Sequence, residues 1–149
     1  ARAADLEAAP FTTWGALETY VSRTARALMW AAAESTEVSL GGVEQGRILD
    51  LAARAWGYCG LLRAEPFWTA RGRSFLPEGA RSADVLEHAR SAYEEAKPLA
   101  RALPAAAFAA IGYVALKTGY LRMVKQGKRE TALFVRQATL VKASATGSI

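Results

Sequence analysis

Apolar residues recur every three or four positions along most of this chain, which is the spacing of helices that bury one face. The first such stretch starts after Thr12 or Thr13, either of which suits a helix N-cap, and continues to about Glu34. Its predicted apolar face consists of Trp14, Leu17, Tyr20, Val21, Thr24, Leu28 and either Ala31 or Ala32. Gly41 and Gly42 interrupt the pattern, so the first helix should end before them.

The same spacing predicts four further helices, at about 43–64, 82–103, 105–125 and 130–141. Pro66 should end the second helix and open a loop. Ser82 should cap the third helix, and Pro98 should kink or break it. The second helix carries small residues, Gly57 and Gly60 among them, that would let a neighbouring helix approach closely.

Composition agrees with an all-α protein, since 52% of the 149 residues are hydrophobic and only five are proline. We therefore predict one helical domain of about five helices over residues 1–142, followed by a flexible tail at residues 143–149. The longest uncharged run, 102–116, holds 15 residues and is shorter than the roughly 20 that span a membrane. The chain begins at Ala1 without methionine, which indicates a processed or trimmed start.

Few side chains offer candidate chemistry. The single cysteine, Cys59, lies in an apolar helical run and is expected to be a small buried hydrophobe. The single histidine, His88, lies among charged residues and should be solvated. No cluster of histidine and cysteine indicates zinc, and we expect neither a metal nor another cofactor.

Charge is unevenly distributed, although the net value is only +5. Residues 1–104 carry 12 basic and 13 acidic side chains, whereas residues 105–149 carry 7 basic and 1 acidic. The basic residues of this C-terminal third are Lys117, Arg122, Lys125, Lys128, Arg129, Arg136 and Lys142. They form either a solvated face or a contact with anionic lipid headgroups or an acidic protein, whereas nucleic acid is disfavoured because no binding motif appears.

Two segments at the end of the second helix resemble a known signature. Leu61-Leu62-Arg63 is followed by Arg71-Gly72-Arg73-Ser74-Phe75-Leu76-Pro77, which is similar to the second signature segment of the squalene/phytoene synthase family. In active members of that family, aspartates stand at the positions of Ala64 and Trp68 in this chain. Two carboxylates four apart share one helix face and can hold Mg²⁺, but alanine offers no ligand and tryptophan only an N–H donor. Glu65 survives, and we expect it to pair with Arg63.

The resemblance reaches over nearly the whole chain but covers only the C-terminal half of the family's fold. Ala1-Arg2-Ala3-Ala4-Asp5-Leu6 and Leu103-Pro104-Ala105 are similar to two further family segments, and the family's first aspartate-rich helix would precede Ala1. The resemblance implies a partial isoprenoid-synthase-like bundle. The run 61–67 is closest to a non-catalytic branch, the assembly factors of respiratory complex I in mitochondria and α-proteobacteria.

This branch implies a non-enzymatic accessory or assembly subunit of a respiratory membrane complex, complex I in particular, peripheral to the mitochondrial inner membrane or the bacterial cytoplasmic membrane. A bundle lacking half its helices would leave apolar stripes for other subunits or anionic lipid to cover, unless the helices repack into a self-sufficient bundle. Among the large apolar side chains that such a bundle would have to cover are the four tryptophans, Trp14, Trp30, Trp56 and Trp68.

Two alternative functions stay open. One is an isoprenoid- or lipid-binding module in which Arg63, Arg71 and Arg73 grip a phosphate, unless these arginines only bridge loop and helix. The other is half of a prenyltransferase that a second chain completes.

Overall fold

The protein is all-helical, as predicted. Its structure, a computed structural model, describes residues 11–36, 42–125 and 132–149, of which none forms a strand, and 78% of the structure is helix. The helices are α1 (Trp14–Val21), α2 (Ala27–Glu34), α3 (Val43–Thr69), α4 (Ser82–Leu99), α5 (Ala105–Phe108), α6 (Lys117–Lys125) and α7 (Leu133–Thr146). Five helices have seven or more residues when α1 and α2 count as one, which agrees with the predicted bundle.

A π-helical turn, Ser22–Arg26, joins α1 to α2, so the three segments form one N-terminal helix. Thr13 caps it as expected, because its side-chain oxygen accepts a hydrogen bond from the amide of Ala16 at 3.2 Å. The π turn adds one residue to the repeat and rotates everything after it by about 100°. Met29 is therefore buried, while Leu28, which the regular spacing placed inside, is 65% exposed.

Helix α3 is longer than predicted, because it continues through Pro66 to Thr69. The proline removes only the hydrogen bond that residue 66 would have donated to the carbonyl of residue 62. The helix ends at Thr69, and the turn that follows contains Gly72, which takes a left-handed φ of 66°. The amides of Arg71 and Arg73 both donate to the carbonyl of Trp68, at 2.9 and 3.0 Å, and satisfy the helix terminus.

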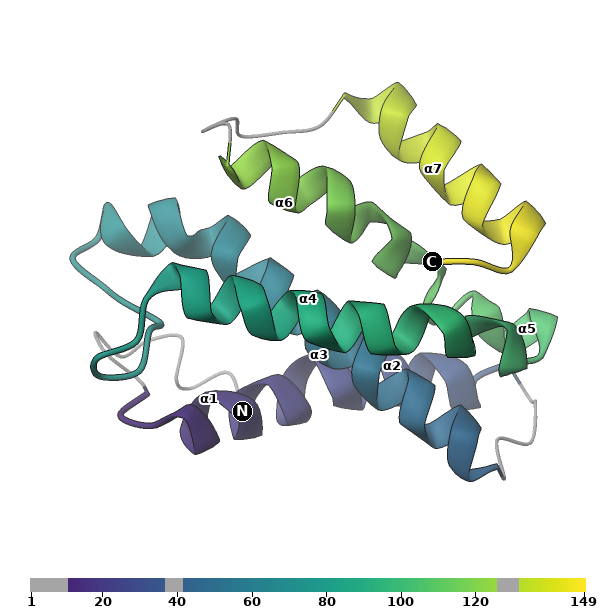
Figure 1. Ribbon diagram of the computed structural model, residues 1–149, viewed down its shortest axis with the longest axis horizontal. Coiled ribbons are helices and arrows are strands. Elements are labelled where there is room, and N and C mark those ends of the chain that lie inside the picture. Colours follow the sequence, from purple (N-terminus) through teal and green to yellow (C-terminus); the bar gives the residue numbers. More distant parts are fainter. Residues whose placement is uncertain (1–10, 37–41, 126–131) are drawn as a thin grey trace.

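Helices α3 and α4 pack side by side and form the centre of the bundle (Figure 1). The N-cap of α4 is Arg81 rather than the predicted Ser82: the Asp84 carboxylate accepts from the Arg81 backbone amide at 2.8 Å. Ser82 instead donates a hydrogen bond to Glu65 on α3. Glu65 therefore joins two helices, and its predicted partner Arg63 lies elsewhere, over the Tyr120 ring at 4.0 Å. Pro98 stands one residue before the end of α4, which then tightens into the 3-10 turn Ala100–Ala102.

The predicted helix over 105–125 is wrong, because the segment is broken in the middle. After the single turn of α5 the chain forms a 3-10 helix, Gly112–Leu116, and only then α6. The buried apolar side chains between residues 105 and 116 are Ala107, Phe108, Ala110, Ile111 and Val114. The break turns apolar side chains of several successive residues inward, which one continuous helix with a single buried face could not do.

The last helix, α7, lies on the outside of the bundle (Figure 1) and packs on the 3-10 helix Gly112–Leu116. It continues to Thr146, five residues beyond the predicted end, and Ala143 and Ile149 are buried in the core. The predicted start of this helix at Glu130 lies outside the described residues. Mobility of residues 143–149 stays a prediction, but their backbone is helical up to Thr146.

Candidate functional site

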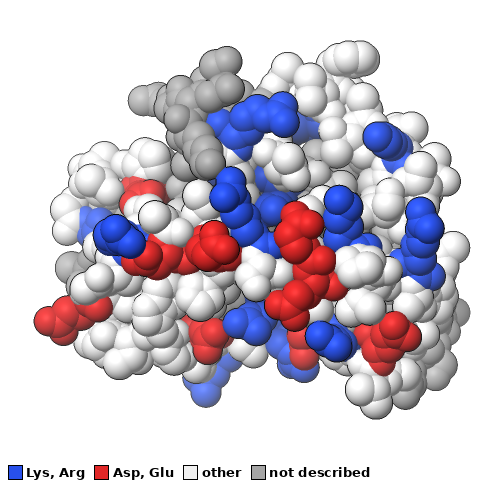
Figure 2. All heavy atoms as spheres, viewed as in Figure 1, with Lys and Arg blue, Asp and Glu red and all other residues white. Residues whose placement is uncertain are grey.

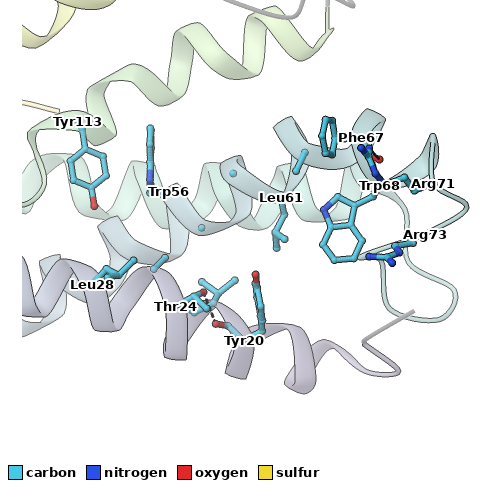
Figure 3. Close-up of a pocket in the computed structure, with 15 residues that line it drawn as sticks. Tyr20, Thr24, Leu28, Trp56, Leu61, Phe67, Trp68, Arg71, Arg73 and Tyr113 are labelled. Atoms are coloured by element: carbon cyan, nitrogen blue, oxygen red, sulfur yellow. Dashed lines mark hydrogen bonds between the residues drawn. The ribbon is translucent and has the colours of Figure 1, made fainter. Parts of the chain in front are cut away.

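A groove of about 510 Å³ runs between the N-terminal helix and α3 (Figure 3). Tyr20, Val21, Thr24, Ala25 and Leu28 line one wall, and Trp56, Gly57, Gly60, Leu61, Ala64, Phe67 and Trp68 line the other. Tyr113 closes one end, whereas Arg71 and Arg73 lie at the other. The lining is apolar except at the arginine end and at the hydroxyl groups of Tyr20, Thr24 and Tyr113.

The groove exists because the two helices cross at Gly57. A Cβ atom placed on Gly57 would lie 2.7 Å from a methyl group of Val21 and 3.2 Å from the Cβ of Ala25. Only glycine allows this approach, which confirms the close contact expected from the small residues of this helix. A Cβ on Gly60 would meet nothing within 4 Å, because Gly60 faces the open groove.

The two positions at which the family signature carries aspartates, Ala64 and Trp68, both line this groove. Ala64 and Trp68 are four residues apart on α3 and therefore share one face of the helix. The continuation of α3 through Pro66 places them there, and Trp68 fills part of the arginine end with its indole ring (Figure 3). Neither side chain is a metal ligand.

The three predicted phosphate-binding arginines are divided between two places. Arg71 and Arg73 line the groove, but Arg63 stacks on Tyr120 away from it. Arg71 also has a structural role, because its guanidinium donates to the carbonyl of Phe67 at 3.1 Å and stacks on the Phe67 ring at 3.8 Å. Arg71 therefore bridges the loop and helix α3, which was one of the two roles expected for these arginines.

Exposed apolar side chains flank the groove. Leu28 and Phe67, on its two walls, are each 65% exposed. Among the tryptophans that were expected to need cover, Trp56 and Trp68 line the groove and all four are half-buried. The described bundle thus leaves apolar side chains exposed on both walls of the groove.

A polar cluster lies beside the groove on the other side of the helix crossing. The Asp50 carboxylate accepts from the Arg26 guanidinium at 2.6 Å and from the Trp30 indole at 2.7 Å. Glu18 pairs with Arg54 at 3.0 Å. These contacts tie the N-terminal helix to α3 and leave their charges satisfied.

The basic C-terminal third is only partly on the surface. Lys117 is 4% exposed and lies over the Tyr93 ring at 3.7 Å, and burial lowers the pKa of its ammonium group. This burial removes Lys117 from the predicted membrane or partner contact. Arg122 is exposed, and Arg136 is half-buried with an Nε that meets no hydrogen-bond acceptor among the described residues. The side chain of Lys125 and residues Lys128 and Arg129 lie outside what the structure describes.

Cys59 and His88 have the predicted environments. Cys59 is fully buried, and burial raises the pKa of its thiol to about 11. His88 is exposed, and its ring lies 4.5 Å from that of Trp14. Within residues 11–36, 42–125 and 132–149, no three His, Cys, Asp or Glu side chains are grouped so that they could hold a metal ion.

Comparisons with protein-family profiles, with curated proteins and with solved structures find no match to this chain. The search of the described helices for a membrane span finds none with the length and apolar character to cross a bilayer.

Sequence reasoning found one wall of the groove and missed the other. Ala64, Trp68, Arg71 and Arg73 were singled out from their spacing in the signature segments. Tyr20, Thr24 and Leu28 were assigned to the core face of their helix, although they line an open groove. The four-residue spacing of Leu17, Val21, Ala25, Met29 and Ala33 was the available signal, because it is too long for a regular helix and fits one π turn.

Proposed function

We propose that this chain is a non-enzymatic accessory or assembly subunit of a respiratory membrane complex, complex I in particular, and that the groove is where a partner subunit binds. The observation that carries the proposal is the groove itself: an open apolar channel with exposed Leu28 and Phe67 on its walls. Exposed apolar surfaces of this kind mark interaction sites in soluble proteins.

The length of the groove suits a helix of the partner. On α3 the lining runs from Trp56 to Trp68, which is about 18 Å along the axis, or roughly three helical turns. A helix laid in such a groove contributes anchors at every third or fourth position. Leu28, Trp56 and Phe67 offer contacts for those anchors.

The proposal of a non-enzymatic role is supported by the two residues that stand where the synthase signature carries aspartates. Ala64 and Trp68 put a methyl group and an indole where active synthases hold carboxylates, so the groove offers apolar contact in place of metal ligands. The choice of complex I, and of a location peripheral to the inner mitochondrial or bacterial cytoplasmic membrane, depends on the resemblance of residues 61–67.

The test is co-migration with the native complex. The tagged full chain, expressed in its own cells, should co-migrate with complex I or an assembly intermediate of it on native gels of mildly solubilised membranes. The Leu28→Glu/Phe67→Glu variant should run free. Val43→Glu is the matched control, because Val43 is 93% exposed and lies outside the groove. A wild-type chain that runs alone, or a double variant that stays bound, contradicts the proposal.

A second candidate function is an isoprenoid- or lipid-binding module in the same groove. It is favoured by Arg71 and Arg73, which place two positive charges at one end of the apolar channel. Charge-assisted hydrogen bonds would hold a phosphate there while the chain of the lipid lay along α3. Mass spectrometry of co-purifying lipid should then show less lipid in Arg71→Ala/Arg73→Ala than in wild type and in Arg101→Ala, an exposed control outside the groove. Equal lipid content in all three removes this candidate.

A further inference from the structure

The outward face of α7 is apolar, which is unusual for a surface helix. Phe134, Ala138, Val141 and Ala145 follow one another at spacings of four, three and four, and all four are exposed. Phe134 and Val141 are 77% and 70% exposed. The opposite face, which includes buried Ala143, packs on the 3-10 helix before α6.

The first turn of α7 adds to this apolar face. Leu133, Phe134 and Val135 are 60%, 77% and 48% exposed, so three successive apolar side chains fan out around one end of the helix. Below we call these three residues with Ala138, Val141 and Ala145 the α7 ridge.

Positive charge accompanies the α7 ridge, and none of the described residues of α6 and α7 is acidic. Lys142 follows Val141 and is exposed, and Arg122 is exposed on α6. Residues 105–125 and 132–149 contain no Asp or Glu. In Figure 2 the charged side chains visible over the upper part of this face are Lys and Arg, while Asp and Glu gather over the middle and lower parts.

We propose that the α7 ridge binds an anionic membrane surface, with the axis of α7 in the plane of the interface. An apolar stripe bordered by lysine is the pattern of helices that insert one face between headgroups. Lys142 would extend its aliphatic stem along the stripe and place its ammonium at the level of the phosphates. The helix is about 21 Å long, and Phe134 and Val141 are two turns apart, so both insert together.

Shape favours a membrane over a protein as the occupant. Helix α7 lies on the outside of the bundle (Figure 1), and the exposed face of a single outer helix fits a planar, deformable interface. The groove proposed for the partner subunit is on a different pair of helices, so the membrane contact does not depend on that proposal.

The experiment places a reporter on the ridge of the full-length chain. Cys59 is fully buried, so an environment-sensitive fluorophore reacts selectively with a new cysteine at Phe134→Cys, and with Val43→Cys as the exposed control. On adding phosphatidylcholine vesicles with about one third phosphatidylglycerol, the label at 134 should shift to the blue, and the label at 43 should not. Pure phosphatidylcholine vesicles should give a much smaller shift, and high salt should reduce the anionic response.

Sedimentation with the same vesicles gives a second measurement without a label. Phe134→Glu/Val141→Glu should lower the partition coefficient by at least about tenfold, because two charges replace the inserted side chains. Val43→Glu and the groove variant Leu28→Glu should bind as wild type. All four positions are exposed, and equal melting temperatures confirm that the variants are folded.

Several outcomes overturn the proposal. An unchanged spectrum at 134 with anionic vesicles does so, as does equal sedimentation of the double variant and wild type. A blue shift that depends on protein concentration without vesicles assigns the ridge to a second copy of the chain. A shift that appears only with solubilised complex assigns it to a protein partner. Loss of co-migration through the groove variant would leave vesicle binding intact, so the two proposals fail separately.

Discussion

Substitution of Gly57 by alanine tests whether the helix crossing that forms the groove is as close as described. The new Cβ would lie 2.7 Å from one Val21 methyl carbon, 3.4 Å from the other, and 3.2 Å from the Cβ of Ala25. Rotation of Val21 cannot relieve the contact, because its χ1 is stiff and Ala25 is fixed to the backbone. The two helices must therefore move apart.

Two opposing effects decide the size of the change. Alanine gains about 0.5–1 kcal/mol over glycine inside a helix, through the lower entropy of the unfolded chain. Overpacking a close contact costs about 1–3 kcal/mol. We expect Gly57→Ala to lose about 1 kcal/mol of unfolding free energy on balance. Gly60→Ala, three residues away with nothing within 4 Å, should keep the full gain of about 0.5–1 kcal/mol.

The assay is urea unfolding of wild type and both variants, followed by circular dichroism. The two variants should differ by about 2 kcal/mol, which corresponds to roughly 4–8 °C in melting temperature for a chain of this size. Val21→Ala in the Gly57→Ala background should relieve the clash and give a coupling energy of about 1–2 kcal/mol. Equal stabilisation by the two glycine substitutions, or no coupling to Val21, would refute the close crossing and with it the shape of the groove.

Three further predictions concern contacts of the bundle outside the groove. Asp50→Ala should cost about 1–2 kcal/mol of stability, because the Trp30 indole loses its acceptor. Glu18→Ala breaks an exposed ion pair and should cost about 0.5 kcal/mol or less. Equal losses of stability in the two variants contradict this reasoning. The folded Cys59 thiol has a pKa of about 11 against an ordinary 9.0, so the unfolded chain ionises first. Stability should therefore fall by up to about 3 kcal/mol as pH rises from 9 to 11, and urea unfolding of Cys59→Ala should lack this component. Lys117 has the opposite sign, since its lowered pKa makes stability rise with pH toward its unfolded value of 10.5, and Lys117→Met should abolish that rise in the same titration.

The helical class followed from the sequence because apolar spacing is a local property. An N-cap at Thr12 or Thr13, helices beginning at about Val43 and after the loop that ends near Ser82, and a close approach at the small residues of the second helix were all predictable from neighbours along the chain. The break after α5 was not predictable, because it depends on how this segment packs into the core. Phe108, Ile111 and Val114 are all buried in the same core. The shape of that core is set by distant parts of the chain and cannot be read from the local sequence.

The candidate site depended more on tertiary structure. Ala64 and Trp68 could be placed on one helix face from their spacing alone, but the expected stop at Pro66 would have removed the turn that carries Trp68. Lys117 was assigned to the surface by its charge. Its aliphatic stem fits an otherwise apolar segment, and the Tyr93 ring receives its ammonium group, so packing overrode the usual preference of lysine for water.

The groove and the α7 ridge lie on different sides of the molecule, and this placement constrains how the chain can act. In Figure 1 the N-terminal helix and α7 lie on opposite sides of the α3–α4 pair. A partner helix in the groove and a bilayer under α7 would therefore not compete for the same surface. If both proposals hold, variants of the two surfaces should combine additively, since they share no contacts. A groove variant should then release the partner while the chain stays on the membrane, and a ridge variant should release the membrane while the partner stays bound. If either variant alone loses both partner binding and membrane binding, the two surfaces form one coupled site. That result would contradict the proposal that the chain binds a partner and a membrane independently.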